Sequence, residues 1–262
     1  MNSDNTKNIK PNITLIGSGP GDIELITVKG LNALKKADVI LYDSLVNLDL
    51  LDYAPIAKKI FVGKRKGFKA YSQEEINQLL VDSALKFGNA IRLKGGDSFV
   101  FGRGFEEVLH AEKYNIPTEV IPGISSSISV PALAGIPVTH RALSNSFYVI
   151  SATLADGKIN PEIQKTTELN GTVVILMGLS KLNEIVEIYQ KNGKVNSKIA
   201  LISNGSLPNQ EVISGEIASI KAIYEKNPVP SPAVIVIGEV VGLLREQEEK
   251  FHSKLVLSGT LN

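Results

Sequence analysis

The sequence predicts an α/β protein with two domains. Three observations favour this fold class: apolar runs of strand length alternate with helical patterns, the character of the strands changes midway, and 262 residues suffice for two domains. Consecutive parallel strands need a crossover between them, which is usually a helix. The alternation therefore predicts a mostly parallel sheet in the first half of the chain.

The first half contains five apolar runs that read as strands. They lie at 12–17, 37–42, 59–63, 90–95 and 118–123. The clearest helix covers 72–87, where Ser72 and Glu75 form a capping box and apolar residues recur at helical spacing. Another helix is expected within 102–115, after a glycine-rich turn.

A loop rich in Gly, Pro, Asn and hydroxyl residues, at 135–146, marks the predicted domain boundary. We therefore expect domains at 12–143 and 144–245. Outside them we expect a flexible N-terminal tail at 1–11 and a C-terminal tail at 246–262.

The second half contains another set of five predicted strands and two helical segments, near 180–190 and 217–226. The strands lie at 147–152, 172–178, 198–204, 210–217 and 233–241. In "EVISGEI" (211–217) apolar and polar residues alternate, which is typical of a half-buried strand. This half is therefore expected to hold a mixed sheet with a hairpin.

Composition excludes several classes of function. The net charge is +1, so no global feature favours nucleic-acid binding. There is no cysteine and the three histidines stand far apart, so we expect no metal site. The N-terminus lacks the apolar core of a signal peptide, and no stretch has the roughly 20 apolar residues of a membrane span. A cytoplasmic protein is expected.

Two glycine-rich turns follow strands and precede helices. "GSGPGD" (17–22) could present backbone N–H groups to an anion, but Asp22 replaces the third glycine of a dinucleotide fingerprint and Pro20 removes a donor. In the second turn (92–104), Asp97 follows Gly95 and Gly96. Its carboxylate suits paired hydroxyls such as those of a ribose, or it caps the following turn. At this level both alternatives stay open for each turn.

The run "KKIFVGKRKGFK" (58–69) has six basic residues and no acidic one. Such a run is usually a solvated surface, but beside a strand end it could attract a substrate with several carboxylates. Met177, after the strand at 172–178, is by default a core residue.

Taken in order, these motifs resemble the tetrapyrrole methylases over residues 12–245. The motifs are "GSGPGD", "ADVILYDSLV", "VGKRKG", "RLKGGDSFVFGRG", "IPGISSSISVPALAGIPVTHR", "VILMG" and "SPAVIVIGEVV". The resemblance implies two α/β domains facing a cleft that holds S-adenosylmethionine, and a homodimer. Among family members, the motifs are most similar to those that methylate C2 and C7 of uroporphyrinogen III to give precorrin-2, on the route to siroheme or cobalamin.

The resemblance also implies roles for particular residues. Asp43 matches the proposed proton acceptor and Lys64 the proposed proton donor, while Arg65 could pair with a substrate carboxylate. The residues implied to contact the cofactor are Pro20, Gly95, Gly96, Asp97, Val100, Ser125, Ser126, Met177 and Gly205. Family members usually have proline at the place of Ser98 and glycine at that of Phe105, which puts the shape of this loop in question.

Three other functions compete with this interpretation. A later precorrin methylase, or more remotely a protein methylase of the same fold, would share the cofactor turns. A nicotinamide-dependent oxidoreductase would use "GSGPGD", although the missing third glycine argues against it. A tetrapyrrole-binding protein without activity would also carry these motifs.

Overall fold

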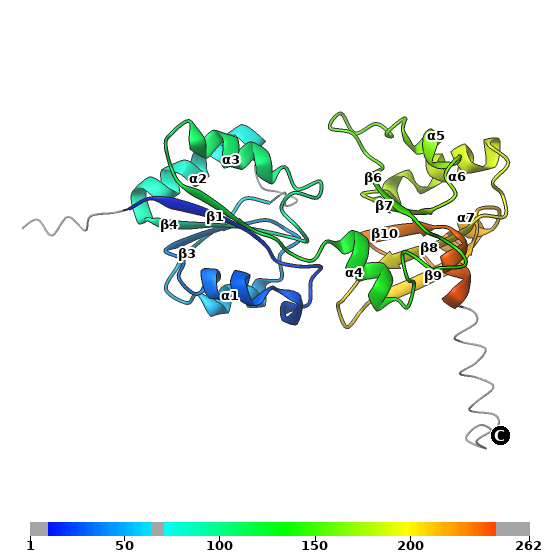
Figure 1. The fold of residues 1–262 in the computed structure, drawn as a ribbon, viewed down its shortest axis with the longest axis horizontal. Helices are drawn as coiled ribbons and strands as arrows, with labels where there is room; N and C mark the ends of the chain where they lie inside the picture. The colour runs from blue at the N-terminus through cyan, green and yellow to red at the C-terminus, as the bar shows by residue number, and fades with distance from the viewer. Residues whose placement is uncertain (1–9, 64–70, 245–262) are drawn as a thin grey trace, which may run out of the picture. The chain divides into compact units, whose positions relative to one another are not determined.

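The computed structural model describes residues 10–63 and 71–244, and the chain divides into two compact units, 1–125 and 126–262 (Figure 1). Each unit contains one five-stranded sheet with helices on its faces. The predicted α/β class is confirmed. Of the two predicted tails, residues 10 and 11 alone fall within the described ranges.

The second unit begins at helix α4 (Ser126–Leu133), whereas the predicted boundary, between 143 and 144, lies within the 135–146 loop. The reason is packing: Val130 of α4 and Ile136 beyond it belong to a core cluster with strands of the second unit. Residues 126–143 therefore belong with the second unit.

The first unit was predicted to hold a mostly parallel sheet. Its sheet is entirely parallel, with the strand order β3-β2-β4-β1-β5. Its strands are β1 (Asn12–Gly17), β2 (Val39–Tyr42), β3 (Lys58–Phe61), β4 (Asn89–Lys94) and β5 (Thr118–Ile121). β1 and β4 lie in the centre, and their apolar runs are buried on both faces. The carboxyl ends of all five strands lie at one edge of the sheet.

Helices cover both faces of this sheet (Figure 1). One face carries η1 (Ile23–Leu25), α1 (Val28–Leu34) and η2 (Leu48–Tyr53), and the other carries α2 (Gln73–Phe87) and α3 (Gly104–Glu112). The predicted capping box begins α2: the Glu75 N–H donates to Ser72 Oγ at 3.1 Å, and the Ser72 N–H donates to Glu75 Oε2 at 2.7 Å.

The second sheet is mixed, with the order β6-β7-β10-β8-β9. Its strands are β6 (Phe147–Ser151), β7 (Thr172–Leu176), β8 (Lys198–Ser203), β9 (Glu211–Glu216) and β10 (Ala233–Ile237). β6 and β7 are parallel, whereas β10 is antiparallel to β7 and β8, and β8 and β9 form the antiparallel pair that the alternation predicted.

In the second unit, α5 (Ile163–Thr166), α6 (Leu182–Lys191) and α7 (Ile220–Lys226) cover one face of the sheet and α4 the other (Figure 1). The short helices η3 (Leu179–Lys181) and η4 (Glu239–Gly242) follow β7 and β10. Across the described ranges, no helix is both long and apolar enough to cross a membrane.

Candidate functional site

The turns after β1, β4 and β5 touch one another at the carboxyl edge of the first sheet. Gly19 and Gly96 exchange backbone hydrogen bonds of 3.1 and 2.7 Å. A Cβ on Gly17 would lie 2.5 Å from the nitrogen of Gly123 and 2.6 Å from the oxygen of Gly96. Glycine is therefore required for the backbones to approach. Ligands of open α/β sheets gather at this edge.

Asp97 links two of these turns through both carboxylate oxygens. Oδ1 accepts the N–H of Phe99 at 2.8 Å, and Oδ2 accepts the N–H of Gly123 at 3.0 Å. The capping role considered for this residue is therefore present. Each oxygen has a second lone pair, so the half-buried carboxylate can still accept hydrogen bonds from two hydroxyls of a ribose.

The other predicted cofactor residues of the first unit lie in or beside these turns. Pro20 is half-buried between Gly19 and Gly21, which both have positive φ. Val100 is 36% exposed beyond Asp97, and Ser125 is buried after β5. These residues thus come from three turns that the Gly19–Gly96 pairing and Asp97 hold together.

The remaining predicted cofactor residues belong to the second unit. Ser126 begins α4. Met177, directly after β7, is 51% exposed, so its default placement in the core is wrong. It has a φ of 54°, and its carbonyl accepts a hydrogen bond from Thr153 Oγ1 at 2.9 Å. Gly205 packs on α4, since a Cβ there would lie 2.5 Å from Val130.

The two departures from the family pattern have visible consequences in the loop after Asp97. Ser98 is fully buried, and its Oγ has no hydrogen-bond partner within the described part of the chain. Phe105 is exposed and packs edge-on against Phe99, with ring centroids 6.0 Å apart.

Asp43 directly follows β2, and two contacts hold its carboxylate. Oδ1 accepts the N–H of Leu45 at 3.1 Å, and Oδ2 lies 3.5 Å from Nη2 of Arg92. The side chain is 24% exposed, so it combines a buried charged neighbour with access to solvent. The carboxylate is therefore both oriented and accessible, as a proton acceptor must be.

Lys64 and Arg65 lie outside the described residues, with most of the basic run. Gly63 precedes them, and a Cβ at Gly63 would lie 2.6 Å from the nitrogen of Ser44. The end of β3 thus lies against the turn that carries Asp43.

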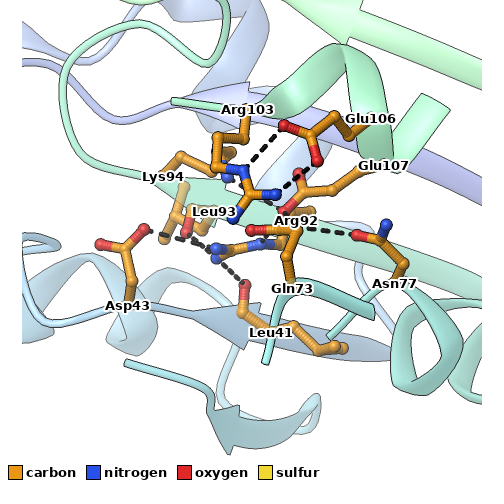
Figure 2. Close-up of polar contacts among 10 residues, drawn as sticks. All are labelled: Leu41, Asp43, Gln73, Asn77, Arg92, Leu93, Lys94, Arg103, Glu106 and Glu107. Atoms are coloured by element: carbon orange, nitrogen blue, oxygen red, sulfur yellow. Dashed lines mark hydrogen bonds and ion pairs between the residues drawn. The ribbon is translucent and has the colours of Figure 1, made fainter. Parts of the chain in front are cut away.

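A cluster of buried charges extends from Asp43 into the first unit (Figure 2). Arg92 and Lys94 alternate along β4 and therefore point to the same face, where α3 places Glu107. Arg92 Nε and Lys94 Nζ each donate to Glu107 Oε1 at 3.0 Å, and Gln73 of α2 donates to the same oxygen at 3.2 Å.

Burial dominates the electrostatics of this cluster. The side chains of Arg92, Lys94 and Glu107 are at most 5% exposed. Burial lowers the pKa of Lys94 below its usual value, and the guanidinium of Arg92 lowers it further, while Glu107 opposes both effects. Oε2 of Glu107 accepts no hydrogen bond from the described residues. Buried, perturbed charges beside the ligand edge of a sheet make this cluster a candidate part of the functional site.

The described ranges hold no group of three or more His, Asp or Glu side chains placed to bind a metal ion.

Comparison with known proteins identifies the family. Residues 12–221 match the family model of the Tetrapyrrole (Corrin/Porphyrin) Methylases. The chain belongs to this family. The match covers all the turns described above, in both units.

Individual members of the family are similar to this chain over most of its length. The chain is 48% identical to the uroporphyrinogen-III C-methyltransferase of Methanocaldococcus jannaschii, over 90% of this chain and 98% of that protein. It is 41% identical to the siroheme synthase of Psychrobacter arcticus, over 90% of this chain and 44% of that longer protein. The crystal structure of the uroporphyrin-III C-methyl transferase of Thermus thermophilus complexed with S-adenyl homocysteine superposes with a TM-score of 0.77. That comparison has 35% identity and covers 88% of this chain and 99% of the other.

The charged cluster of this tetrapyrrole methylase was missed by the sequence analysis. A signal was present: in "AIRLKG" two basic residues alternate within an apolar strand, so both would need buried partners. Their partner Glu107 could not be chosen from several acidic residues nearby, because its pairing depends on how α3 packs on the sheet.

Proposed function

We propose that this tetrapyrrole methylase transfers methyl groups from S-adenosylmethionine to C2 and C7 of uroporphyrinogen III, giving precorrin-2. The observation that carries the proposal is the 48% identity to the uroporphyrinogen-III C-methyltransferase of M. jannaschii, which extends over nearly the full length of both chains. The similarity to a siroheme synthase favours the siroheme route for the product, with cobalamin as the other route from precorrin-2.

The methyl donor is supported by the Thermus relative, which was crystallised with S-adenyl homocysteine, the form that remains after the methyl group has left. The residues of this chain fit such a ligand for two reasons. Asp97 can still accept hydrogen bonds from a ribose, and the glycines of the turns have no side chains to keep a ligand away from the backbone. In the first unit, we assign six residues to cofactor contact: Pro20, Gly95, Gly96, Asp97, Val100 and Ser125. In the second unit, we assign Ser126, Met177 and Gly205.

The reaction needs alignment more than a covalent intermediate. When bound, S-adenosylmethionine supplies an electrophilic methyl group to an electron-rich pyrrole carbon: the new C–C bond forms as the C–S bond breaks. The chain must hold the two reactants in line and exclude water, which can supply a large part of the rate.

Asp43 and Lys64 are assigned to proton transfer. Methylation adds a positive charge to the macrocycle, and loss of a proton from carbon restores neutrality, so a partly exposed carboxylate such as Asp43 can serve as acceptor. Lys64 is assigned as donor, since its sequence neighbour Gly63 lies against Ser44 in the Asp43 turn. Arg65 is assigned to a substrate carboxylate, for which a guanidinium gives bidentate pairing.

The enzyme is further proposed to act as a cytoplasmic homodimer, as the family resemblance implies. Light scattering of the purified protein at several concentrations tests the dimer, since a monomer mass throughout would exclude it.

The direct test is mass spectrometry of the tetrapyrrole after anaerobic incubation of the protein with uroporphyrinogen III and S-adenosylmethionine. A gain of two methyl groups is expected. No gain, in a preparation that binds S-adenosylhomocysteine, would move the assignment to a later precorrin methylase or to a binding protein. Incubation with NAD in place of S-adenosylmethionine tests the oxidoreductase alternative.

A further inference from the structure

Arg92 connects the candidate base Asp43 to the interior of the first unit. Its Nε donates to Glu107 Oε1 at 3.0 Å, and its Nη1 donates to the backbone oxygens of Leu93 and Leu41 at 3.0 and 3.4 Å. Its Nη2 faces Asp43 Oδ2 at 3.5 Å. These three contacts of Nε and Nη1 fix the orientation of the guanidinium. Its Nη2 is then directed at the Asp43 carboxylate (Figure 2).

The charges of the cluster balance when Asp43 is included. Arg92 and Lys94 are two cations that share one oxygen of Glu107, which leaves a positive charge without a buried counterpart. Asp43 contributes the second carboxylate, and it does so through Arg92. An isolated charge in a protein interior is expensive, so this arrangement favours a fixed contact between Arg92 and Asp43.

We propose that Arg92, held by Glu107, is a positioning residue that orients the Asp43 carboxylate for proton uptake. The inference deepens the proposed function and rests on it. A general base must point at the proton that it removes, and Arg92 fixes that direction from the buried side of the carboxylate. Arg92 itself need not touch substrate.

The chain offers a matched pair of variants for the test. Arg92→Met removes the contact with Asp43 but keeps an apolar stem and leaves Lys94 to pair with Glu107. Lys94→Met removes the other cation from the same oxygen and leaves Arg92 in place. Among the described residues, no hydrogen bond or ion pair joins Lys94 to Asp43. Both variants therefore lose one buried cation, whereas only Arg92→Met loses the contact under test.

The two variants are expected to differ in the kinetics of methyl transfer. For Arg92→Met we expect kcat to fall roughly 10- to 100-fold, with KM within about threefold of wild type. Lys94→Met should lower kcat far less while losing a comparable amount of thermal stability.

Arg92→Lys separates charge from geometry. It keeps the positive charge but lacks the planar fork, so kcat should fall to a value between those of wild type and Arg92→Met. Binding of S-adenosylhomocysteine, measured by calorimetry, should be unchanged within about threefold in all three variants, since Arg92 does not act on the cofactor.

Crystal structures of wild type and Arg92→Met give a readout that does not depend on activity. We expect the Asp43 side chain to leave its position in the variant while Glu107 and Lys94 keep theirs. A wild-type protein that transfers no methyl group would overturn the proposed function and leave this structural comparison to decide the role of Arg92. The role is overturned if Asp43 keeps its position, or if Lys94→Met lowers kcat as far as Arg92→Met does.

Discussion

Gly95 lies against Leu45: a Cβ built on Gly95 would be only 2.7 Å from the Cβ of Leu45. The turn after β4, which leads to Asp97, is therefore packed directly on the turn after β2, which carries Asp43. Through this contact, the turn assigned to the cofactor fixes the position of the turn assigned to proton transfer.

Replacing Gly95 with Ala should therefore disturb Asp43 as well as the turn itself. We expect kcat to fall at least about tenfold and stability to fall by about 1 to 3 kcal/mol, because the added methyl group must push Leu45 away. Adding Leu45→Gly removes the obstructing Cβ, so the double variant should regain part of the activity in a methyl-transfer assay. A double variant as slow as Gly95→Ala would show that the contact does not couple the two turns.

Asp43→Asn tests the assignment of the base with little change of shape. The amide cannot take up a proton, so kcat should fall by about 100-fold or more, while calorimetry should show normal binding of S-adenosylhomocysteine. Asp49→Asn, an exposed change in η2 nearby, is the control and should retain full activity. Activity of Asp43→Asn above about a third of wild type would remove Asp43 from this role.

Tyr189 should make the second unit sensitive to alkaline pH. Its hydroxyl lies 2.8 Å from Thr166 Oγ1 in the core, and burial raises its pKa to about 12 from a usual 10.0. Between these values the unfolded chain loses the phenolic proton and the folded chain keeps it, so stability falls as pH rises, by about 1.4 kcal/mol at pH 11.

Urea unfolding at about pH 9 and pH 11 checks this expectation. Tyr189→Phe should lack this loss between the two pH values, whereas the exposed Tyr148→Phe should retain it. An equal loss in Tyr189→Phe and wild type would show that the Tyr189 phenol does not cause it.

Ser98→Ala should be neutral or stabilising. The buried Oγ of Ser98 accepts and donates no hydrogen bond within the described ranges, so its removal relieves an unmatched polar group by up to about 1 kcal/mol. Ser72→Ala is the matched change at a working cap and should cost about 1 kcal/mol. Thermal unfolding compares the two, and an equal loss from both would mean that the Ser98 hydroxyl is satisfied in solution.

Local signals made much of the fold predictable. The buried parallel strands produce continuous apolar runs, and the capping box at Ser72 and Glu75 lies within four residues of sequence, so β1 and the start of α2 match expectation closely. The alternation in β9 likewise marked the antiparallel pair with β8.

Features that depend on tertiary packing could not be predicted from local sequence patterns. α4 contains Pro131 and three serines, which are poor helix formers, and it is helical because Val130 packs into the core of the second unit. Met177 is exposed because the chain turns with positive φ directly after β7. The pairing of Arg92 with Glu107 spans 15 residues and exists only once α3 is docked.

The proposed activity is methylation of C2 and C7 of uroporphyrinogen III. The most direct measurement uses S-adenosylmethionine labelled with ¹³C in the transferred methyl group, followed by ¹³C NMR of the tetrapyrrole product under anaerobic conditions. We expect two labelled methyl carbons, one bonded to C2 and one to C7. Label at any other ring position, or an unlabelled tetrapyrrole after incubation with active cofactor-binding protein, would contradict it.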